Sequence, residues 1–360
     1  MTPLIWLVAG GTGGHLWPAV AFGQWLQSRG GGWAPIILAG SRPLEREILE
    51  TTTLPWESLP LEGSPLGVSG AARWGRWKGL WQSWARCREL LCRHRPWAAV
   101  LFGGYVSLPA LGACMAHRVP VVFHEQNARA GRATRMAAAL GVPVASGWDE
   151  CDPLKPGAFR PVGIPLRVME RLPNRAEWNK LSDGPPIPER RHVLVLGGSL
   201  GSGFLEKRVR DLARRHPFRR WTFLLLGGKG GGDMPENCLA VPRQWDMGPL
   251  YAGADLALSR GGGATLAELL SLGLPSLVIP WQGASEGHQA ANAAAFVRLG
   301  GGMVLPESAP LESLEEALKS LSRMKRRQIT VAGPCASEKL WREVRAVATM
   351  KGDAFRNGRG

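Results

Sequence analysis

The sequence LIWLVAGGTGGH at residues 4–15 joins a short apolar run to a glycine-rich turn, and HVLVLGGSLGSG at residues 192–203 repeats this arrangement. Each copy predicts a buried strand, a turn whose glycines let backbone N–H groups approach a phosphate, and a following helix. Two copies predict two Rossmann-like domains. Such domains bind ligands at the carboxyl ends of their strands, so we expect loops from both sheets to line a central cleft.

Around these stretches, short apolar runs alternate with longer amphipathic segments, a pattern typical of parallel sheets covered by helices. Strands are expected at residues 4–8, 35–39, 99–102, 119–123 and 142–145, and again at 192–197, 221–226, 256–258 and 276–279. Helices are expected at residues 18–29, 43–50, 106–117 and 130–139, and again at 203–215, 265–272, 287–299, 311–321 and 337–350. The predicted fold class is α/β with two parallel sheets.

The predicted domain boundaries follow from a change in composition. Residues 160–191 contain many prolines and no sustained hydrophobic period, as expected of a linker. We expect an N-terminal domain at 1–162, a linker at 163–190, a C-terminal domain at 191–336, a terminal helix at 337–350 and a disordered tail at 351–360.

The charge of the chain favours an anionic partner. Among 360 residues, 44 Lys and Arg outnumber 29 Asp and Glu, so the net charge is +15. A nucleic acid, a phosphorylated substrate or an acidic membrane would each complement this charge. The six cysteines form no C-x-x-C pair, which argues against a disulfide framework and favours a reducing compartment. No run reaches the roughly 18 apolar residues of a membrane-spanning helix.

The turn GGTGGH at residues 10–15 matches neither common nucleotide-binding motif. Leu16 stands where a dinucleotide fingerprint has its third glycine, and no G-K-[ST] follows as in a P-loop. A tight strand-to-helix turn would also need glycine. His15 favours a site instead, because a histidine beside a phosphate-binding loop can act as an acid or base near neutral pH.

The segment SRGGGATLAE at residues 259–268 allows two interpretations. The N-terminus of the predicted helix could bind a diphosphate while Glu268 accepts hydrogen bonds from ribose hydroxyls. Alternatively, Thr265 and Glu268 have the spacing of a capping box, which would only stabilise the start of the helix. The sequence alone leaves these alternatives equal.

Polar residues also follow other predicted strands, where they are poor core material and well placed to bind a sugar. HEQN at residues 124–127 is one such group, and Gly103, Gly104 and Tyr105 form another. A polar turn, or a buried tyrosine with a satisfied hydroxyl, is the alternative. His288 and Gln289 lie at a predicted helix start and could equally be solvated.

Tryptophans are concentrated at residues 73–97, where seven arginines and lysines accompany a single acid, Glu89. A helix would align four of them on one face, because their spacings are three and four. Basic residues beside an aromatic stripe are typical of a helix in an anionic membrane interface, although packing in the core is the alternative. The four residues are Trp74, Trp77, Trp81 and Trp84.

Several catalytic motifs are missing from the sequence. It has no Asp-x-Asp pair for a metal on a diphosphate, no H-E-x-x-H and no G-x-S-x-G. We therefore expect no metal and no cofactor, with phosphate charge met by backbone dipoles and by Arg or Lys side chains.

Seven motifs occur in one order over nearly the whole chain: AGGTGGHLWPA, FGGYVSLPA, HEQN, GIPLR, LGGSLGS, SRGGGATLAE and HQAANA. Together they resemble the bacterial undecaprenyldiphospho-muramoylpentapeptide β-N-acetylglucosaminyltransferases, the MurG family within glycosyltransferase family 28. The resemblance implies a GT-B fold with the donor on the C-terminal domain and the acceptor lipid on the N-terminal one. It implies inverting transfer of N-acetylglucosamine from UDP-N-acetylglucosamine to lipid I at the cytoplasmic face of the membrane, for peptidoglycan synthesis. Other cell-wall and division proteins are further implied partners, and nucleic acid is not.

The resemblance also assigns roles to residues of this sequence. We expect His15, or failing it Glu125, to be the general base that deprotonates the acceptor hydroxyl. Substrate-binding roles are implied for Thr12, Gly13, Gly14, Tyr105, Asn127, Arg167, Ser199, Gln244, Ala264, Thr265, Leu266, Ala267, Glu268, His288 and Gln289.

The sequence departs from the family pattern at four positions. Ile164 replaces the usual Asn of GIPLR, Gly261 replaces a Ser, His288 replaces a Gln, and Gln244 replaces an apolar residue near the uracil. Two other functions are weighed against the transferase. A UDP-sugar 2-epimerase can share the fold and the donor but gives the tryptophan stretch no role. An RNA-binding protein would suit the charge but has no need of the glycine loops.

Overall fold

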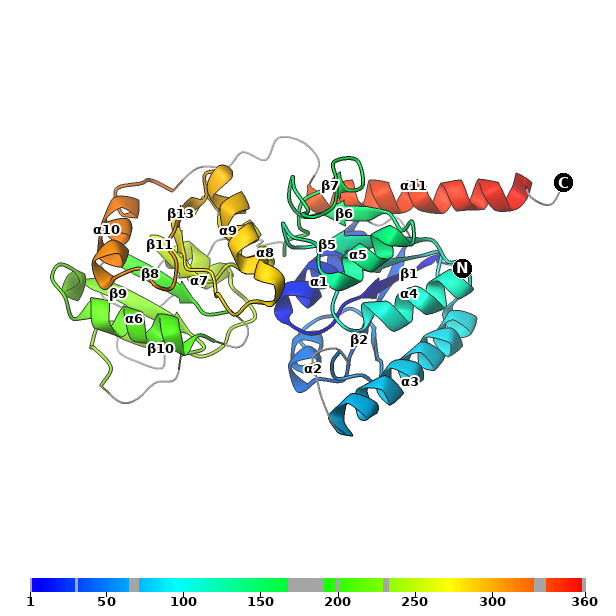
Figure 1. Ribbon diagram of the computed structural model, residues 1–360, viewed down its shortest axis with the longest axis horizontal. Coiled ribbons are helices and arrows are strands. Elements are labelled where there is room, and N and C mark those ends of the chain that lie inside the picture. The colour runs from blue at the N-terminus through cyan, green and yellow to red at the C-terminus, as the bar shows by residue number, and fades with distance from the viewer. Residues whose placement is uncertain are drawn as a thin grey trace. The chain divides into compact units, whose positions relative to one another are not determined.

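The computed structural model describes residues 2–29, 32–64, 71–167, 191–198, 201–228, 233–326 and 335–357. The chain divides into two compact units, Met1–Arg167 together with Ala332–Gly360, and Val168–Val331 (Figure 1). Each unit is built on a parallel sheet with helices packed on it. Within the described ranges, none of the helices combines the length and hydropathy needed to cross a bilayer.

The sheet of the first unit has seven strands in the order β3-β2-β1-β4-β5-β6-β7, and every pairing is parallel. The strands are β1 (Leu4–Val8), β2 (Ala34–Ala39), β3 (Trp56–Ser58), β4 (Ala98–Leu101), β5 (Val121–Glu125), β6 (Val144–Ser146) and β7 (Arg160–Pro161). The helices are α1 (Gly13–Ser28), α2 (Pro43–Leu49), α3 (Ala71–His94), α4 (Ser107–Ala116), α5 (Arg132–Ala139) and α11 (Ala336–Asn357).

The sheet of the second unit has six strands in the order β10-β9-β8-β11-β12-β13, again all parallel. The strands are β8 (Arg191–Leu196), β9 (Trp221–Leu226), β10 (Cys238–Val241), β11 (Leu256–Ser259), β12 (Ser276–Val278) and β13 (Gly302–Val304). The helices are α6 (Gly203–Ala213), α7 (Gly248–Gly253), α8 (Gly263–Ser271), α9 (His288–Arg298) and α10 (Leu311–Leu321), with short 3-10 turns η2 (Phe218–Arg220) and η3 (Ser285–Gly287).

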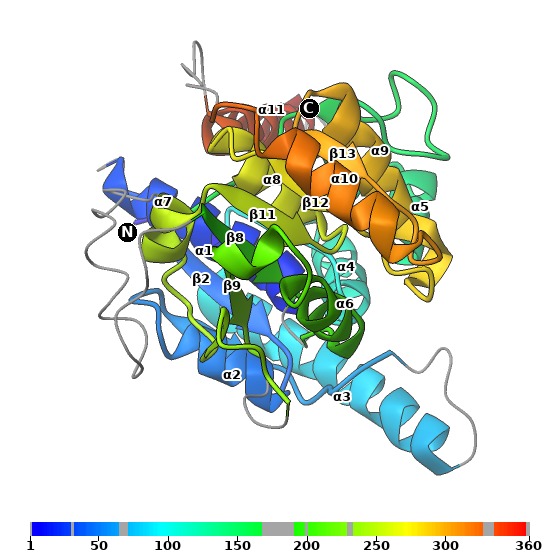
Figure 2. The same cartoon turned by 90° about the vertical axis from the view of Figure 1, so that its left-hand side faces the viewer.

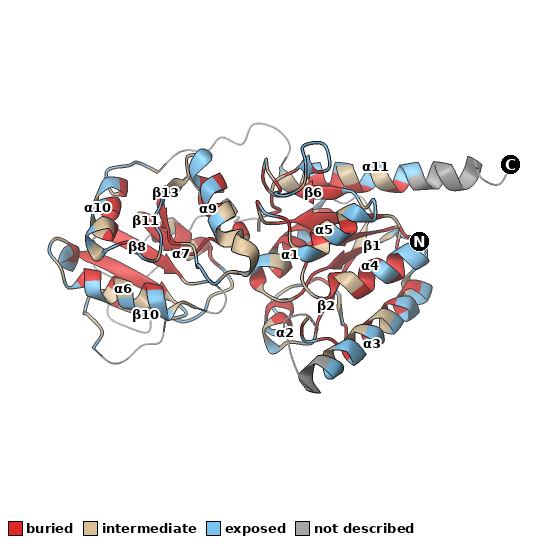
Figure 3. Ribbon diagram, in the orientation of Figure 1, coloured by how far each residue is buried: buried red, intermediate tan, exposed pale blue. Residues whose placement is uncertain are grey.

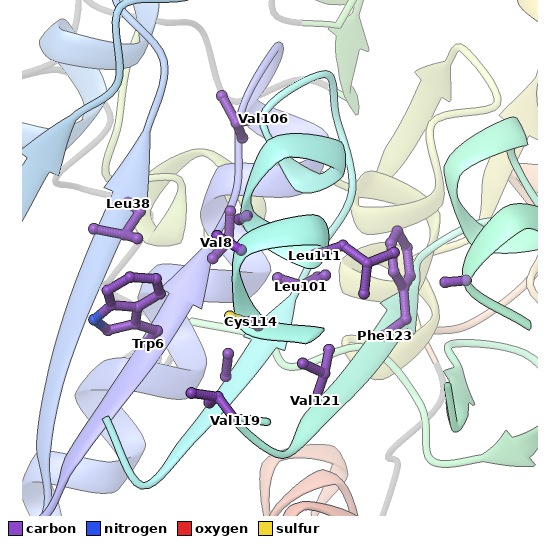
Figure 4. Close-up of a cluster of buried hydrophobic side chains, with 14 of the residues drawn as sticks. Trp6, Val8, Leu38, Leu101, Val106, Leu111, Cys114, Val119, Val121 and Phe123 are labelled. Carbon is purple, nitrogen blue, oxygen red and sulfur yellow. The ribbon is translucent and has the colours of Figure 1, made fainter. Parts of the chain in front are cut away.

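Alternating side chains of the strands build the core of each unit. In the first unit, Trp6 and Val8 of β1 and Phe123 of β5 pack against Leu111 and Cys114 of α4 (Figure 4). In the second unit, the corresponding layer lies between the sheet and helices α6 and α10 (Figure 2). The strands of both sheets are mostly buried, whereas α3 keeps an exposed outer side (Figure 3).

The last helix of the chain belongs to the first unit. The Trp341 ring of α11 lies 4.7 Å from that of Trp33 and 5.9 Å from that of Trp97, measured between centroids. Arg29 at the end of α1 lies 3.6 Å from the Glu338 carboxylate. The helix runs to Asn357, so it continues seven residues into the segment predicted as a disordered tail. Most of the predicted linker lies outside the described residues.

Candidate functional site

The loops after β1 and β4 meet in the first unit, because these strands are neighbours in the sheet while the chain leaves β1 toward β2. This reversal of strand order is where open α/β sheets bind ligands. Two glycines let the loops touch. A Cβ at Gly104, whose φ is +79°, would lie 2.0 Å from the Gly10 carbonyl oxygen, and one at Gly10 would lie 2.8 Å from a methyl carbon of Val106.

The buried carboxylate of Glu45 supports the loops after β1 and β4. Glu45 of α2 accepts hydrogen bonds from the Gly11 and Arg42 backbone N–H groups, the second at 3.0 Å, and from the Tyr105 hydroxyl at 2.7 Å. Burial is the main cause of a raised pKa for Tyr105, so its hydroxyl stays protonated and donates. The sequence predicted that Tyr105 binds substrate; in the structure its hydroxyl supports the glycine loop through Glu45. Glu45 was missed, because nothing in its local sequence marks it as buried.

The first turn of α1 presents backbone donors. The helix starts at Gly13 with Thr12 at the N-cap position, and no described side chain makes a capping hydrogen bond there. Gly14 is exposed, and a Cβ on it would meet only the Thr12 hydroxyl, at 3.5 Å. An uncapped helix start with accessible N–H groups favours an anionic ligand.

His15 lies one residue further along this turn, and its ring is held by two neighbours. Its Nδ1 lies 2.7 Å from the Gln126 side-chain oxygen. A Cβ at Gly103, whose φ is +96°, would lie 3.0 Å from the His15 Cε1 and Nδ1 atoms. Glycine at position 103 therefore allows the ring to lie directly against the backbone that follows β4.

Glu125, the second candidate base, is tied into the structure through both carboxylate oxygens. Oε1 accepts from the Asn127 backbone N–H at 3.0 Å and from its side-chain amide at 2.8 Å. Oε2 accepts from the Gly131 N–H at 3.0 Å and from the Thr134 hydroxyl. Four hydrogen bonds thus engage both oxygens of this buried carboxylate and hold it in place. The arrangement favours His15 as the base, and it orients the Asn127 amide.

His124 is fully buried and gives the first unit a pH-dependent stability. Burial is the main cause that lowers its pKa to about 4, against an ordinary value near 6.5. Between these values the unfolded chain binds a proton that the folded chain excludes, so stability falls as pH drops from 6.5 to 4. The expected loss is about 3 kcal/mol.

Urea unfolding of the wild type and of His124→Gln, measured at several pH values in this window, checks this expectation. Carboxylates titrate in both proteins, so the difference between the two slopes isolates the histidine. We expect the wild type to lose more stability on acidification than the variant. Equal slopes would contradict the assignment.

In the second unit, the loops after β8 and β11 meet at the corresponding point, because β8 and β11 are neighbours. The loop after β11 leads into α8, whose N-cap is Gly262. Thr265 is therefore the third residue of the helix, so the capping-box interpretation of Thr265 and Glu268 is wrong. No side chain in the described part of the chain caps α8, so the donors of its first turn favour a diphosphate.

Glu268 lies one turn after these donors and is almost fully buried. Its Oε2 accepts a hydrogen bond of 2.6 Å from the hydroxyl of Tyr251 on α7. Ala264, Thr265 and Ala267 of the same helix are half-buried. Leu266 is fully buried in the core, so only its backbone can contribute to a ligand site.

The start of α9 is bound to the loop that precedes α8. The Gln289 side-chain oxygen accepts from the Gly261 N–H at 3.0 Å and from the Trp281 N–H at 2.9 Å. A Cβ at Gly261 would lie 2.3 Å from the Gln289 carbonyl oxygen, so this chain needs glycine at position 261. His288 Nε2 lies 3.9 Å from the Glu286 carboxylate. Gln289 therefore ties the loop after β11 and the loop after β12 to the start of α9.

Three other predicted residues are placed as follows. Gln244 is half-buried on the segment between β10 and α7. Ser199 lies outside the described residues. Arg167 lies in the first unit, with its guanidinium carbon 4.3 Å from the centroid of the Trp17 ring on α1. Its charge is therefore placed beside the glycine loop.

Arg260 is a buried cation at the carboxyl end of β11 that sequence reasoning did not single out. It forms an ion pair of 2.8 Å with Glu307 and donates to the Ile279 carbonyl at 3.0 Å and to the Ser202 hydroxyl at 3.2 Å. It therefore ties the loop after β8 to β12. Across the described ranges, no group of three or more His, Cys, Asp or Glu side chains could hold a metal ion.

The predicted tryptophan helix is α3, and its stripe is exposed. Trp74, Trp77 and Trp81 have 79%, 37% and 66% of their surface exposed, which excludes the core-packing alternative for them. Trp84 is half-buried and contacts the Trp81 ring at 5.8 Å between centroids. We call Trp74, Trp77, Trp81 and Trp84, with the exposed Lys78 and Arg88, the α3 surface.

The sequence of this chain is similar to families and proteins that are already known. Residues 5–140 match the N-terminal domain and residues 192–340 the C-terminal domain of glycosyltransferase family 28. A relative from Alkalilimnicola ehrlichii is named UDP-N-acetylglucosamine--N-acetylmuramyl-(pentapeptide) pyrophosphoryl-undecaprenol N-acetylglucosamine transferase. It is 35% identical over 322 residues, which cover 86% of each chain. A relative of the same name from Gloeobacter violaceus is 32% identical and covers 94% of this chain and 96% of its own.

Solved structures share the fold. A crystal structure of Acinetobacter baumannii MurG has a TM-score of 0.69 at 24% identity and covers 96% of this chain and 99% of that one. A UDP-GlcNAc 2-epimerase from Methanocaldococcus jannaschii has a TM-score of 0.60 at 12% identity, with coverages of 95% and 99%. The two parallel α/β units have the predicted GT-B architecture. The matched domains and the sequence relatives show that the chain belongs to glycosyltransferase family 28 and, within it, to the MurG family.

Proposed function

We propose that this chain is an inverting glycosyltransferase that moves N-acetylglucosamine from UDP-N-acetylglucosamine to the muramoyl 4-hydroxyl of lipid I, forming lipid II. The observation that carries the proposal is the uncapped start of α8 beside the buried Glu268, in a chain whose relatives are named for this transfer. A helix start that offers free donors, followed by a carboxylate, suits a diphosphate joined to a ribose.

The second unit would bind the donor. Its diphosphate would accept hydrogen bonds from the first N–H groups of α8, and Glu268 would accept from the ribose hydroxyls. Gln289 would position the donor sugar through the loops that it joins. Contacts of Ser199, Gln244 and His288 with the donor remain predictions from the family resemblance.

The first unit would bind the acceptor. The start of α1, with Thr12, Gly13 and Gly14, would meet the lipid pyrophosphate, and the nearby Arg167 would add a positive charge. Asn127 would hold a hydroxyl of the acceptor sugar. The place of Arg167 on Trp17 favours a contact with the acceptor rather than with the donor diphosphate.

The proposed reaction is a single displacement at the anomeric carbon of the donor. The acceptor oxygen forms a bond to this carbon as the bond to the UDP oxygen breaks, and inversion results. His15 takes the proton from the acceptor hydroxyl, and UDP leaves with the electron pair of the broken bond. The α8 helix start stabilises the charge that develops on the departing diphosphate.

We further propose that the α3 surface docks the protein on the cytoplasmic face of the bacterial membrane. Exposed tryptophans flanked by bases match an anionic lipid interface, where indole rings lie at the headgroup level. This placement would bring the first unit to the membrane in which the lipid acceptor resides.

Replacing Trp74, Trp77 and Trp81 together with Ser should lower the affinity for vesicles of anionic phospholipid by roughly a hundredfold. Each ring would otherwise bury apolar surface worth on the order of 1 kcal/mol. Sedimentation with vesicles measures the binding, and UDP affinity should not change. Trp281→Ser, which removes an exposed tryptophan from the second unit, is the matched control. Wild-type vesicle binding by the triple variant would refute the docking proposal.

The transfer itself is tested with labelled UDP-N-acetylglucosamine and a lipid I analogue, with and without EDTA. We expect label in the lipid product under both conditions, since helix donors and arginines replace a metal in this proposal. Formation of the manno epimer from the donor alone, with no lipid product, would identify an epimerase instead. Loss of transfer in EDTA would overturn the metal-free mechanism.

A further inference from the structure

The ring of His15 is one end of a hydrogen-bonded chain whose other end is a backbone carbonyl. Its Nδ1 lies 2.7 Å from Gln126 Oε1. Gln126 Nε2 lies 2.9 Å from both the ring Nδ1 and the carbonyl oxygen of His124. His124 Nε2 in turn lies 2.9 Å from the Gly163 carbonyl oxygen. These hydrogen bonds thus link the turn after β1, the end of β5 and the segment after β7.

Two carbonyl oxygens fix the position of every proton along this series of hydrogen bonds, because a carbonyl oxygen can only accept. The Gly163 oxygen requires a hydrogen on His124 Nε2. The His124 oxygen requires the amide nitrogen of Gln126 to face it, since the amide oxygen would be repelled there. The Gln126 oxygen must then face His15, and its hydrogen-bonded partner, the His15 Nδ1, must carry a hydrogen.

The neutral state of His124, which its complete burial maintains, supports the same proton positions. With its hydrogen on Nε2, its Nδ1 has a lone pair and accepts the second hydrogen of the Gln126 amide. Both amide hydrogens of Gln126 are therefore engaged on the side of His124. The residue has no hydrogen left to offer His15, so the reverse orientation of the amide would break two bonds at once.

We propose that Gln126 is a positioning residue that holds His15 in the tautomer with hydrogen on Nδ1, so that Nε2 carries the lone pair that receives the acceptor proton. The inference rests on the proposed function and adds to it the atom that acts as base. When Nε2 takes the proton, the imidazolium still donates from Nδ1 to Gln126, so the contact is kept through the step. A neutral amide orients the ring without placing a negative charge beside the acceptor pyrophosphate.

Nitrogen-15 NMR of histidine-labelled wild-type protein reads this tautomer without any variant. The His15 ring should show a protonated Nδ1 and an unprotonated Nε2, whereas an unconstrained neutral imidazole favours hydrogen on Nε2. The exposed His117 provides the unconstrained reference within the same spectrum. Hydrogen on Nε2 of His15 would overturn the proposal, whatever reaction the enzyme performs.

Gln126→Met tests the consequence for the reaction, because methionine has a similar volume and cannot orient the ring. We expect the His15 tautomer to shift toward Nε2–H and kcat for transfer to fall on the order of tenfold or more, with KM for UDP-N-acetylglucosamine unchanged. Gln27→Met, the same substitution at an exposed position of α1, should leave both readouts at wild-type values.

The outcomes separate this inference from the proposed function. A tautomer shift with wild-type kcat, or a fall in kcat without a tautomer shift, would overturn the positioning role while transfer by the wild type stands. If the wild type transfers no sugar, the proposed function fails, and the NMR result still decides how the His15 ring is held.

Discussion

His15→Ala is expected to lower kcat for transfer to a lipid I analogue by about 10²- to 10⁴-fold, the usual contribution of a general base. The acceptor hydroxyl would then have to lose its proton to water during the displacement. KM for UDP-N-acetylglucosamine should stay near its wild-type value, because the donor is assigned to the second unit. Steady-state kinetics with a soluble acceptor analogue measures both constants.

The matched control for this variant is His117→Ala, which removes an exposed histidine at the end of α4 and should retain wild-type kcat. Near wild-type turnover by His15→Ala at saturating donor would eliminate His15 as the base. Glu125 would then be the remaining candidate, despite the four hydrogen bonds that engage its carboxylate.

Glu268→Gln is expected to raise KM for UDP-N-acetylglucosamine by about 10- to 100-fold. Hydrogen bonds from ribose hydroxyls to a carboxylate contribute about 1.5–3 kcal/mol, and an amide accepts them more weakly. The amide oxygen can still accept from the Tyr251 hydroxyl, so thermal stability should change little. Donor titrations together with thermal unfolding separate these two effects.

Tyr251→Phe is the control for the alternative that Glu268 serves only to accept the hydrogen bond of the Tyr251 hydroxyl. That variant removes the internal hydrogen bond and keeps the carboxylate, so donor KM should rise much less than in Glu268→Gln. An unchanged donor KM in Glu268→Gln would remove Glu268 from the donor site and leave it a structural role.

The central strands of both sheets were predictable because continuous apolar runs identify strands that are buried on both faces. The four strands that sequence reasoning missed, β3, β7, β10 and β13, are the four edges of the two sheets. Edge strands pair on one side only and are partly exposed, and these four are two to four residues long. They carry no sustained apolar run to reveal them.

Helix starts were predicted less well than helix interiors. The helix α1 begins at Gly13, five residues before its expected start, and α8 begins at Gly263 rather than Thr265. Glycines open both helices, and glycine contributes no hydrophobic pattern. Those early starts matter for function, because they place the uncapped N–H groups at the ends of β1 and β11.

The glycine loops, HEQN and the α8 segment could be found from the sequence because they follow recognisable strands. The long-range contacts that support them could not be found in this way. Glu45 acts on Gly11 across 34 positions, Gln126 on His15 across 111, and Arg260 on Ser202 across 58. Such partners are brought together only by the topology of the fold, and no spacing in the sequence predicts them.

The proposed transfer depends on the start of α8 and Glu268 binding the nucleotide part of the donor. A crystal structure of the protein with UDP tests it most directly. We expect the diphosphate oxygens on the first N–H groups of α8 and the ribose hydroxyls on the Glu268 carboxylate. A UDP molecule bound elsewhere, with α8 and Glu268 unoccupied, would contradict it.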